Sequence, residues 1–245
     1  MLMMPASACA LMSEERTVTF SDERTWWHYV FSSWEGMFML WLMHIAIYVL
    51  VNIDVPYKNG APPPGDRHWP YNVVIVGPVY VAVYFYVAKP PTHTDWYWDL
   101  LRLVVAIVIY DFVFWLVHRA LHTDTLFRNI HYYHHQWRYN LHPVSALDCH
   151  PFEHVILNVA PLLFALWLTG MSRAGSSVVL LFAPVLSQNA HMDYRTAHGA
   201  HHLHRTCNFG GFGGGGLADA LFGTECSKHL CKATNDEDTP GTGKH

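Results

Sequence analysis

The chain has 245 residues, of which 51% are hydrophobic, 15% aromatic and only 14% charged. A typical soluble domain is about 25% charged, so this composition excludes a disordered protein and argues against an ordinary soluble enzyme. The formal net charge of −4 gives no basic excess of the kind that indicates a nucleic-acid partner.

Three long apolar runs follow a polar N-terminal segment at 1–33, which we expect to lie outside the membrane. The runs cover residues 36–52, 71–88 and 100–117. Each approaches the roughly 20 residues that a helix needs to cross a bilayer core. Tryptophans cluster near the ends of the runs, as they do at membrane interfaces. We therefore predict transmembrane helices over 34–117, and buried helices of a soluble bundle are the less favoured interpretation.

After a polar stretch at 118–154 the chain forms a second apolar pair, at 155–169 and 176–190, separated by the polar turn GMSRAG. This pattern predicts a helical hairpin, either two short spans or a re-entrant pair. Because a hairpin returns to the side that it left, the polar clusters at 118–154 and 191–204 should share one membrane face. The predicted fold is an all-α integral membrane protein with four to five apolar helices and a histidine-rich cap.

Histidine is the unusual residue of this composition, since its 19 copies equal Asp and Glu together. His118 and His122 form an H-x3-H pair, and two H-x2-HH groups begin at His131 and His198. On a helix, residues three and four apart share a face, and imidazole suits iron, zinc and copper. Eight histidines exceed what one ion can hold, so the motifs predict a two-metal site rather than a solvated histidine-rich patch.

The remaining composition narrows the class of metal site. The sequence lacks the Glu-x-x-His pairs of carboxylate-bridged di-iron bundles. Its five cysteines form no CxxC pair, so neither a disulfide framework nor a zinc finger is expected.

The N-terminus has no basic region before its apolar residues, so we do not expect a cleaved signal peptide. Three arginines in the loop at 118–152, opposed by two aspartates, favour a cytosolic face for the cluster.

Six segments carry a family resemblance: DFVFWLVHRALH (111–122), NIHYYHHQW (129–137), CHPFEH (149–154), AHMDYRTAHGAHH (190–202), NFG (208–210) and the closing LFGT (221–224). Together they resemble the fatty acid hydroxylase and sterol desaturase superfamily over roughly residues 100–224. CHPFEHVILN followed by the hairpin and HMDY is most similar to the 4-methyl sterol oxidase branch. We accordingly expect a histidine-rich catalytic region at 118–224, with the hairpin inserted at 155–190, and a polar tail at 225–245.

The resemblance implies a multi-pass enzyme of the endoplasmic reticulum with two iron ions, for which zinc could substitute in isolated protein. It implies O2 as oxidant, electrons from cytochrome b5 and an NAD(P)H reductase, and a sterol or other lipid as substrate. Within enzymes the alternatives are fatty acid or sphingoid hydroxylation and sterol C5-desaturation. Outside enzymes the alternatives are a divalent-metal transporter, a metal-binding scaffold and a catalytically inactive relative.

The resemblance also assigns residues. The implied metal ligands are His118, His122, His131, His134, His135, His150, His191, His198, His201 and His202. Of these, His150 is either a ligand or a residue that orients one. Asp111 is expected to accept an imidazole N–H, with helix packing as the alternative role.

Two departures from the family pattern stand near the end of the region. Only six residues separate His191 from His198, fewer than usual. The family's Trp-Asp-Arg is replaced by Ala218, Asp219 and Ala220, and the segment before it is the glycine-rich 210–216.

Overall fold

The computed structural model describes residues 33–53, 67–92, 94–138, 140–192, 194–211 and 216–226. Within these ranges every regular element is a helix, which confirms the all-α prediction. The predicted N-terminal segment lies outside the described residues except for Ser33, and so does the tail beyond residue 226.

Five long helical segments form the body of the molecule. The first is α2 (Trp34–Ile53), and the second joins α3 (Trp69–Tyr71), η2 (Asn72–Val76) and α4 (Gly77–Ala88). The third is α5 (Trp96–Leu121). The fourth joins α8 (Pro151–Glu153), η5 (His154–Val159) and α9 (Ala160–Thr169), and the fifth is α10 (Arg173–Ala190). In the described residues, three segments are long and apolar enough to cross a membrane: Trp69–Ala88, Trp96–Leu121 and Pro151–Thr169.

The predicted hairpin is confirmed, and its turn is defined by local chemistry. Gly170 ends α9 in the left-handed region with φ 64°, where a side chain would be strained. The Ser172 side chain accepts a hydrogen bond from the Gly175 N–H and so caps α10. Asp99, in the first turn of α5, accepts from both the backbone N–H and the hydroxyl of Ser172. The tip of the hairpin is therefore fastened to the start of α5.

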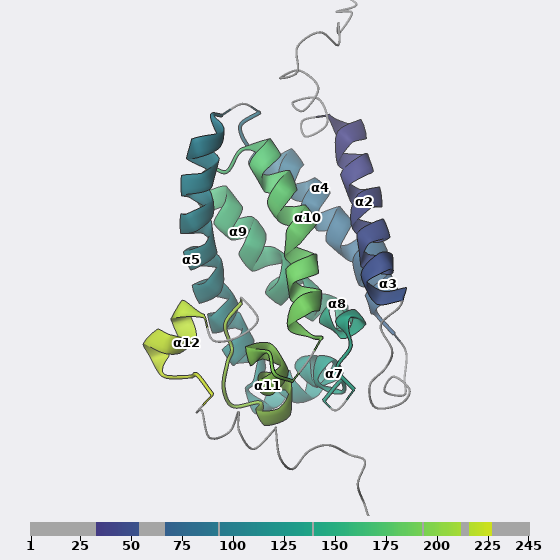
Figure 1. Cartoon of the computed structure of the whole chain (residues 1–245), viewed down its shortest axis with the longest axis vertical. Helices are drawn as coiled ribbons and strands as arrows, with labels where there is room; N and C mark the ends of the chain where they lie inside the picture. Colours follow the sequence, from purple (N-terminus) through teal and green to yellow (C-terminus); the bar gives the residue numbers. More distant parts are fainter. Residues whose placement is uncertain are drawn as a thin grey trace, which may run out of the picture.

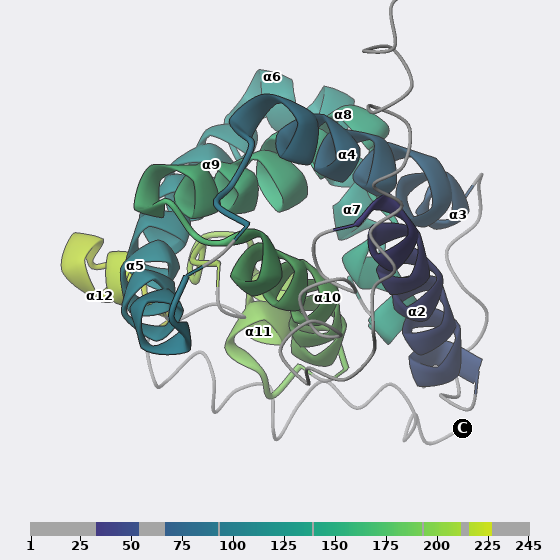
Figure 2. The same cartoon turned by 90° about the horizontal axis from the view of Figure 1, so that it is seen from above.

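The long helices run side by side, and α5 packs against α9 (Figure 1). Seen from above, α2, α4, α9 and α5 form an arc with α10 on its open side (Figure 2). The outward face of α5 is strongly apolar, since Leu100, Leu101 and Val104 are 53–62% exposed. Such a surface suits a lipid environment, and the chain is a multi-pass membrane protein.

The short helices gather at one end of the bundle (Figure 1). They are α6 (Asp124–Leu126), η3 (Phe127–His131), α7 (Tyr132–His135), η4 (Pro143–Ala146), α11 (Ala197–His204) and α12 (Leu217–Phe222). Helices α5 and α10 both end there. The prediction that the two histidine clusters lie at the same end is confirmed.

Candidate metal centre

Nine of the ten predicted histidines converge in two groups. We call the first the five-histidine group: His118, His122, His131, His135 and His201. We call the second the four-histidine group: His134, His191, His198 and His202. Within each group one nitrogen of every ring lies within 4.8 Å of all the others.

Helical spacing explains how the motifs divide. His131 and His135 are four residues apart on η3 and α7 and enter the five-histidine group, while His134 enters the other. On α11, His198 and His202 share the four-histidine group, and His201 faces the five-histidine group. Each H-x2-HH motif thus supplies both groups, because neighbouring residues of a helix point about 100° apart.

Oxygen acceptors fix the orientation of three rings in the five-histidine group. His118 Nδ1 lies 2.9 Å from the Phe209 carbonyl oxygen, and His201 Nδ1 lies 2.7 Å from that of Cys207. His131 Nδ1 lies 2.8 Å from Glu153 Oε1. A carbonyl oxygen only accepts, so the rings of His118 and His201 carry their proton on Nδ1. Their Nε2 atoms then present lone pairs to the interior of the group.

The Nε2 atoms of this group lie so close together that ring protons cannot provide a hydrogen-bond donor for every Nε2 lone pair. His131 Nε2 lies 3.1 Å from His118 Nε2, 3.0 Å from His122 Nε2 and 3.1 Å from His135 Nε2. Burial lowers the pKa of His131, His135 and His201 well below the ordinary value, so these rings are neutral at pH 7. Converging lone pairs of neutral imidazoles fit a bound metal cation.

The four-histidine group shows the same chemistry. His191 Nδ1 lies 2.7 Å from the Ser187 carbonyl oxygen, and its Nε2 lies 3.3 Å from His134 Nε2. Neither ring nitrogen of His202 has a hydrogen-bond partner, and His198 Nε2 has none. Burial lowers the pKa of His191 to about 4 and that of His198 and His202 well below 6.5. Unpartnered buried nitrogens that stay neutral are the donor set that a metal ion requires.

His150 lies outside both groups. Its Nδ1 accepts a hydrogen bond from the Phe152 N–H at 3.2 Å and caps the start of α8. Cys149 is fully buried beside it, and burial raises the pKa of its thiol well above the ordinary value. A neutral thiol is not the form that ligates metals.

Asp111 is buried inside α5 and contacts backbone rather than an imidazole. Its carboxylate accepts from the Gly211 N–H at 3.0 Å and from the Ala218 N–H at 2.8 Å. These amides belong to the closing segment, by which we mean residues 207–211 and 216–226. Because the same segment supplies the Phe209 carbonyl to His118, Asp111 acts on that ring through the backbone of the segment.

In the glycine-rich stretch at 210–216, where the sequence departs from the family pattern, steric contacts explain the glycine at two positions. A Cβ on Gly210 would lie 2.8 Å from Asp219 Oδ2 and 3.0 Å from Asp111 Oδ1. A Cβ on Gly216 would collide with the Asp111 carboxylate. Close approach of the backbone to the two aspartates therefore requires glycine here.

Three contributors to the site were missed by sequence reasoning. Glu153 belongs to the CHPFEH motif, and its position beside an apolar run is a sequence signal for a functional carboxylate. Asp219 is fully buried and accepts from the N–H groups of Phe209 and Gly210, and its match to the central Asp of the family's Trp-Asp-Arg was the available signal. A disulfide joins Cys207 to Cys226 across a separation of 19 residues, and cysteine spacing gave no indication of it.

A cavity of about 600 Å³ reaches the four-histidine group. His134, His191 and His198 line it together with His118. Most of the other lining residues are apolar side chains of α5, α9 and α10, with a few polar side chains that include Glu153, Asn158 and Thr196. The volume falls within the usual range for small-molecule sites, and the lining suits an apolar ligand.

Comparison with known proteins gives consistent matches. The family model described as Fatty acid hydroxylase matches residues 103–224. The chain is 28% identical over 144 residues to "Fatty acid hydroxylase domain-containing protein 2" of Homo sapiens, covering 56% of this chain and 42% of that protein. It is 29% identical over 171 residues to "Fatty acid hydroxylase ahd1" of Mycosarcoma maydis, covering 63% and 43%. The matches thus span less than half the length of these relatives. No solved structure matches the chain.

Proposed function

Because the chain belongs to the fatty acid hydroxylase family, we propose that it is a membrane-bound di-iron oxygenase that oxidises a C–H bond of a lipid. The observation that carries the proposal is the pair of histidine groups at the end of an apolar cavity. A transporter or scaffold would not need a cavity of this kind beside both ligand sets.

We assign one iron to each group, held by the inward nitrogens of the five-histidine and four-histidine groups. Two irons bound there would supply the reductive activation of O2 that oxidation of an unactivated C–H bond requires. The chain contributes position and environment. The Phe209, Cys207 and Ser187 carbonyls orient three ligand rings, and the apolar cavity wall keeps water from the reacting carbon.

Two substrate classes follow from different observations. The printed names of the relatives support a fatty acid or another acyl chain. The CHPFEHVILN and HMDY segments support a sterol, with chemistry like that of a 4-methyl sterol oxidase. Both are elongated and apolar, as the cavity requires.

We further propose that the protein resides in the endoplasmic reticulum membrane with its histidines facing the cytosol, where cytochrome b5 and an NAD(P)H reductase deliver electrons. The arginines of the loop at 118–152 support this orientation. The Cys207–Cys226 disulfide is the observation against it, because disulfides persist mainly in oxidising compartments. Labelling of single engineered cysteines in sealed microsomes distinguishes the two faces.

The activity is tested by expressing the protein in membranes and supplying ¹⁸O2, NADPH, cytochrome b5 and its reductase. A 4-methyl sterol and a long-chain fatty acid are offered in parallel. We expect ¹⁸O in one product by mass spectrometry, lost in both His134→Ala and His201→Ala but kept in His150→Ala, because His150 lies outside both histidine groups. Label incorporation that survives both ligand substitutions would contradict the assignment.

A further inference from the structure

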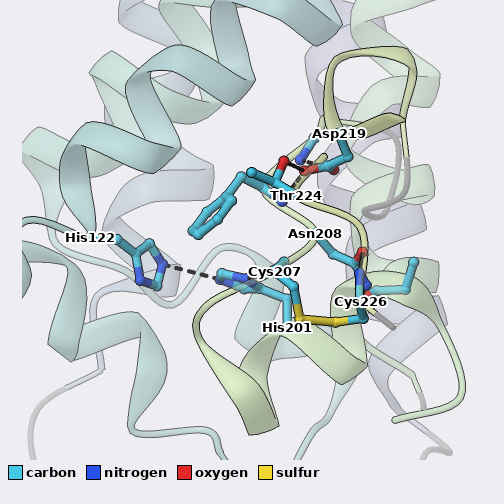
Figure 3. The surroundings of a disulfide bond; sticks show 10 residues. His122, His201, Cys207, Asn208, Asp219, Thr224 and Cys226 are labelled. Carbon is cyan, nitrogen blue, oxygen red and sulfur yellow. Dashed lines mark hydrogen bonds between the residues drawn. A yellow bond between two sulfur atoms is a disulfide. The ribbon is translucent and has the colours of Figure 1, made fainter. Parts of the chain in front are cut away.

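The disulfide between Cys207 and Cys226 lies next to the five-histidine group (Figure 3). Cys207 is buried, and the two Cα atoms are 5.0 Å apart. The bond joins the two ends of the closing segment. Nothing in the metal assignment above requires it.

The residue that forms the disulfide also orients a ligand. The Cys207 carbonyl oxygen accepts from His201 Nδ1 at 2.7 Å, and His201 Nε2 faces His122 Nε2 at 3.1 Å (Figure 3). Two residues further on, the Phe209 carbonyl oxygen accepts from His118 Nδ1. Two of the five rings in the group therefore take their orientation from three consecutive residues beginning at the disulfide, 207–209.

Hydrogen bonds pair the ends of the closing segment around this point. The Asn208 N–H donates to the Thr224 carbonyl at 2.7 Å, and the Cys226 N–H donates to Asn208 Oδ1 at 2.9 Å. Asn208 Nδ2 also donates to the Ala197 carbonyl at the start of α11. The disulfide is the covalent member of this set and ties the Cys207 backbone to the other end of the closing segment at Cys226, while the Asn208–Ala197 hydrogen bond ties the same stretch to α11.

The glycine content of the sequence between Cys207 and Cys226 increases the conformational entropy that a disulfide across this loop can remove. Six of the seven residues at 210–216 are glycine, and glycine has the largest conformational freedom to lose on ordering. A crosslink that closes such a loop removes much of this freedom from the open state. Opening the bond therefore removes the covalent constraint that this loop closure places on the Cys207 and Phe209 carbonyls.

We propose that Cys207 and Cys226 are positioning residues of the metal centre, whose disulfide fixes the carbonyls that orient His201 and His118 and so strengthens metal binding by the five-histidine group. This inference rests on the proposed metal-binding function. The four-histidine group takes the acceptor of His191 from Ser187 of α10 instead. The disulfide should therefore affect the two groups unequally.

The test compares oxidised and reduced forms of the full-length protein in detergent, loaded with metal and titrated with a chelator. A phosphine is used as reductant, since dithiols bind metal ions. It cleaves the S–S bond with water, and the two cysteines gain two electrons and two protons as the phosphine becomes its oxide. We expect the first ion to be lost at about ten-fold lower chelator concentration after reduction, the lower end of the effect of removing a group that orients a ligand.

The variant Cys207→Ser/Cys226→Ser keeps both backbone carbonyls and removes only the crosslink. It should lose its first ion as readily as reduced wild type and should not respond to the phosphine. Cys149→Ser, which removes a buried thiol outside the closing segment, should respond as wild type does. If the double variant does not fold, the comparison within wild type decides.

Equal retention of both ions by oxidised and reduced wild type would overturn the inference. A thiol count showing Cys207 and Cys226 free in the isolated protein would do the same. Histidine modification in metal-free protein gives an independent readout. Reduction should raise the reactivity of His201 and His118 with diethyl pyrocarbonate and leave that of His191 unchanged. If oxidised protein binds no metal the proposed function fails, and this last comparison still tests the positioning role.

Discussion

At the scale of single residues, an oxygen acceptor at Nδ1 sets the direction of four of the nine grouped imidazoles, those of His118, His131, His191 and His201. Carbonyls of Phe209, Cys207 and Ser187 and the carboxylate of Glu153 each lie within 2.7–2.9 Å of an Nδ1 atom. Such partners fix the tautomer of a ligand and raise its basicity. The ligands are thus prepared for metal by groups that never touch the ion.

Glu153 provides the sharpest test of this arrangement. Replacing it with Leu removes the acceptor of His131 Nδ1, and we expect the affinity of the five-histidine group for its ion to fall about 10–100-fold. Glu153→Gln keeps an oxygen acceptor and should lose less. Chelator titration followed by metal analysis measures both. Wild-type retention in Glu153→Leu would show that the contact does not support the ligand.

Burial also predicts a pH dependence for metal-free protein. Burial lowers the pKa of His191 to about 4 in the folded state against 6.5 for the free side chain, and it also lowers the pKa values of His198, His201 and His202 well below 6.5. The unfolded state then binds more protons as the pH drops, so folding stability decreases with falling pH. The loss begins near pH 6.5 and continues toward pH 4.

The thermal unfolding midpoint of metal-free protein in detergent should be constant between pH 7.5 and 8.5 and fall progressively from pH 6.5 to 5. Metal-loaded protein should resist the first part of this decrease, since the metal competes with protons. A midpoint that does not change from pH 8 to 5 would contradict neutral, buried imidazoles.

The histidines that converge in the two groups could be predicted from sequence, while the groups that orient their rings could not. Spacings of three and four residues place His131, His134 and His135 on adjoining helical positions whatever the surroundings. The acceptors at Cys207 and Phe209 are main-chain atoms, and their location depends on how residues 207–226 fold. His150 shows the reverse case, since it matches a family motif yet caps α8 in the structure.

At the scale of elements, hydropathy locates the helices but not the residues at which they begin. The third apolar run begins at Leu100, whereas α5 begins at Trp96 after Asp95. The hairpin's second run begins at Ser176, whereas α10 begins at Arg173 because Ser172 caps it. Polar first turns are invisible to a hydropathy pattern, so the helices extend beyond the predicted runs.

The closing segment is the element that no periodicity predicts, and Asp111 is its main anchor on α5. Asp111→Asn places an amide against one of the two backbone donors, and an unpaired buried N–H costs about 1–3 kcal/mol. We expect faster hydrogen exchange at the Gly211 and Ala218 amides, measured by mass spectrometry. The exposed Asp124→Asn should leave them unchanged. Unchanged exchange in Asp111→Asn would show that the segment is held without it.

At the scale of the whole molecule, α2, α4, α9 and α5 form an arc of apolar helices (Figure 2). The lining of the cavity combines side chains of α5, α9 and α10 with His118, His134, His191 and His198. The apolar outer surface faces lipid, and the polar centre occupies one end. This arrangement explains the low charge content of the sequence, because a metal centre for lipid substrates needs apolar surface both outside and inside. The position of the cavity could not be predicted, since it depends on how α5, α9 and α10 pack.

Filling the cavity should separate substrate binding from metal binding. Ala183 lines the cavity on α10 and is not among the ligands. Ala183→Phe should reduce lipid oxidation at least ten-fold while metal content stays at the wild-type level. Leu100→Phe, on the exposed face of α5, serves as the matched control. Undiminished oxidation in Ala183→Phe would place the substrate elsewhere.

The most direct measurement is the metal content of purified protein by mass spectrometry, compared with one substitution in each group. The account predicts two metal ions per chain in wild type, one in His135→Ala, one in His202→Ala and two in His150→Ala. Iron as the bound metal would support the oxygenase proposal. A single ion in wild type, or two ions in both His135→Ala and His202→Ala, would contradict the division of the nine histidines into two metal sites.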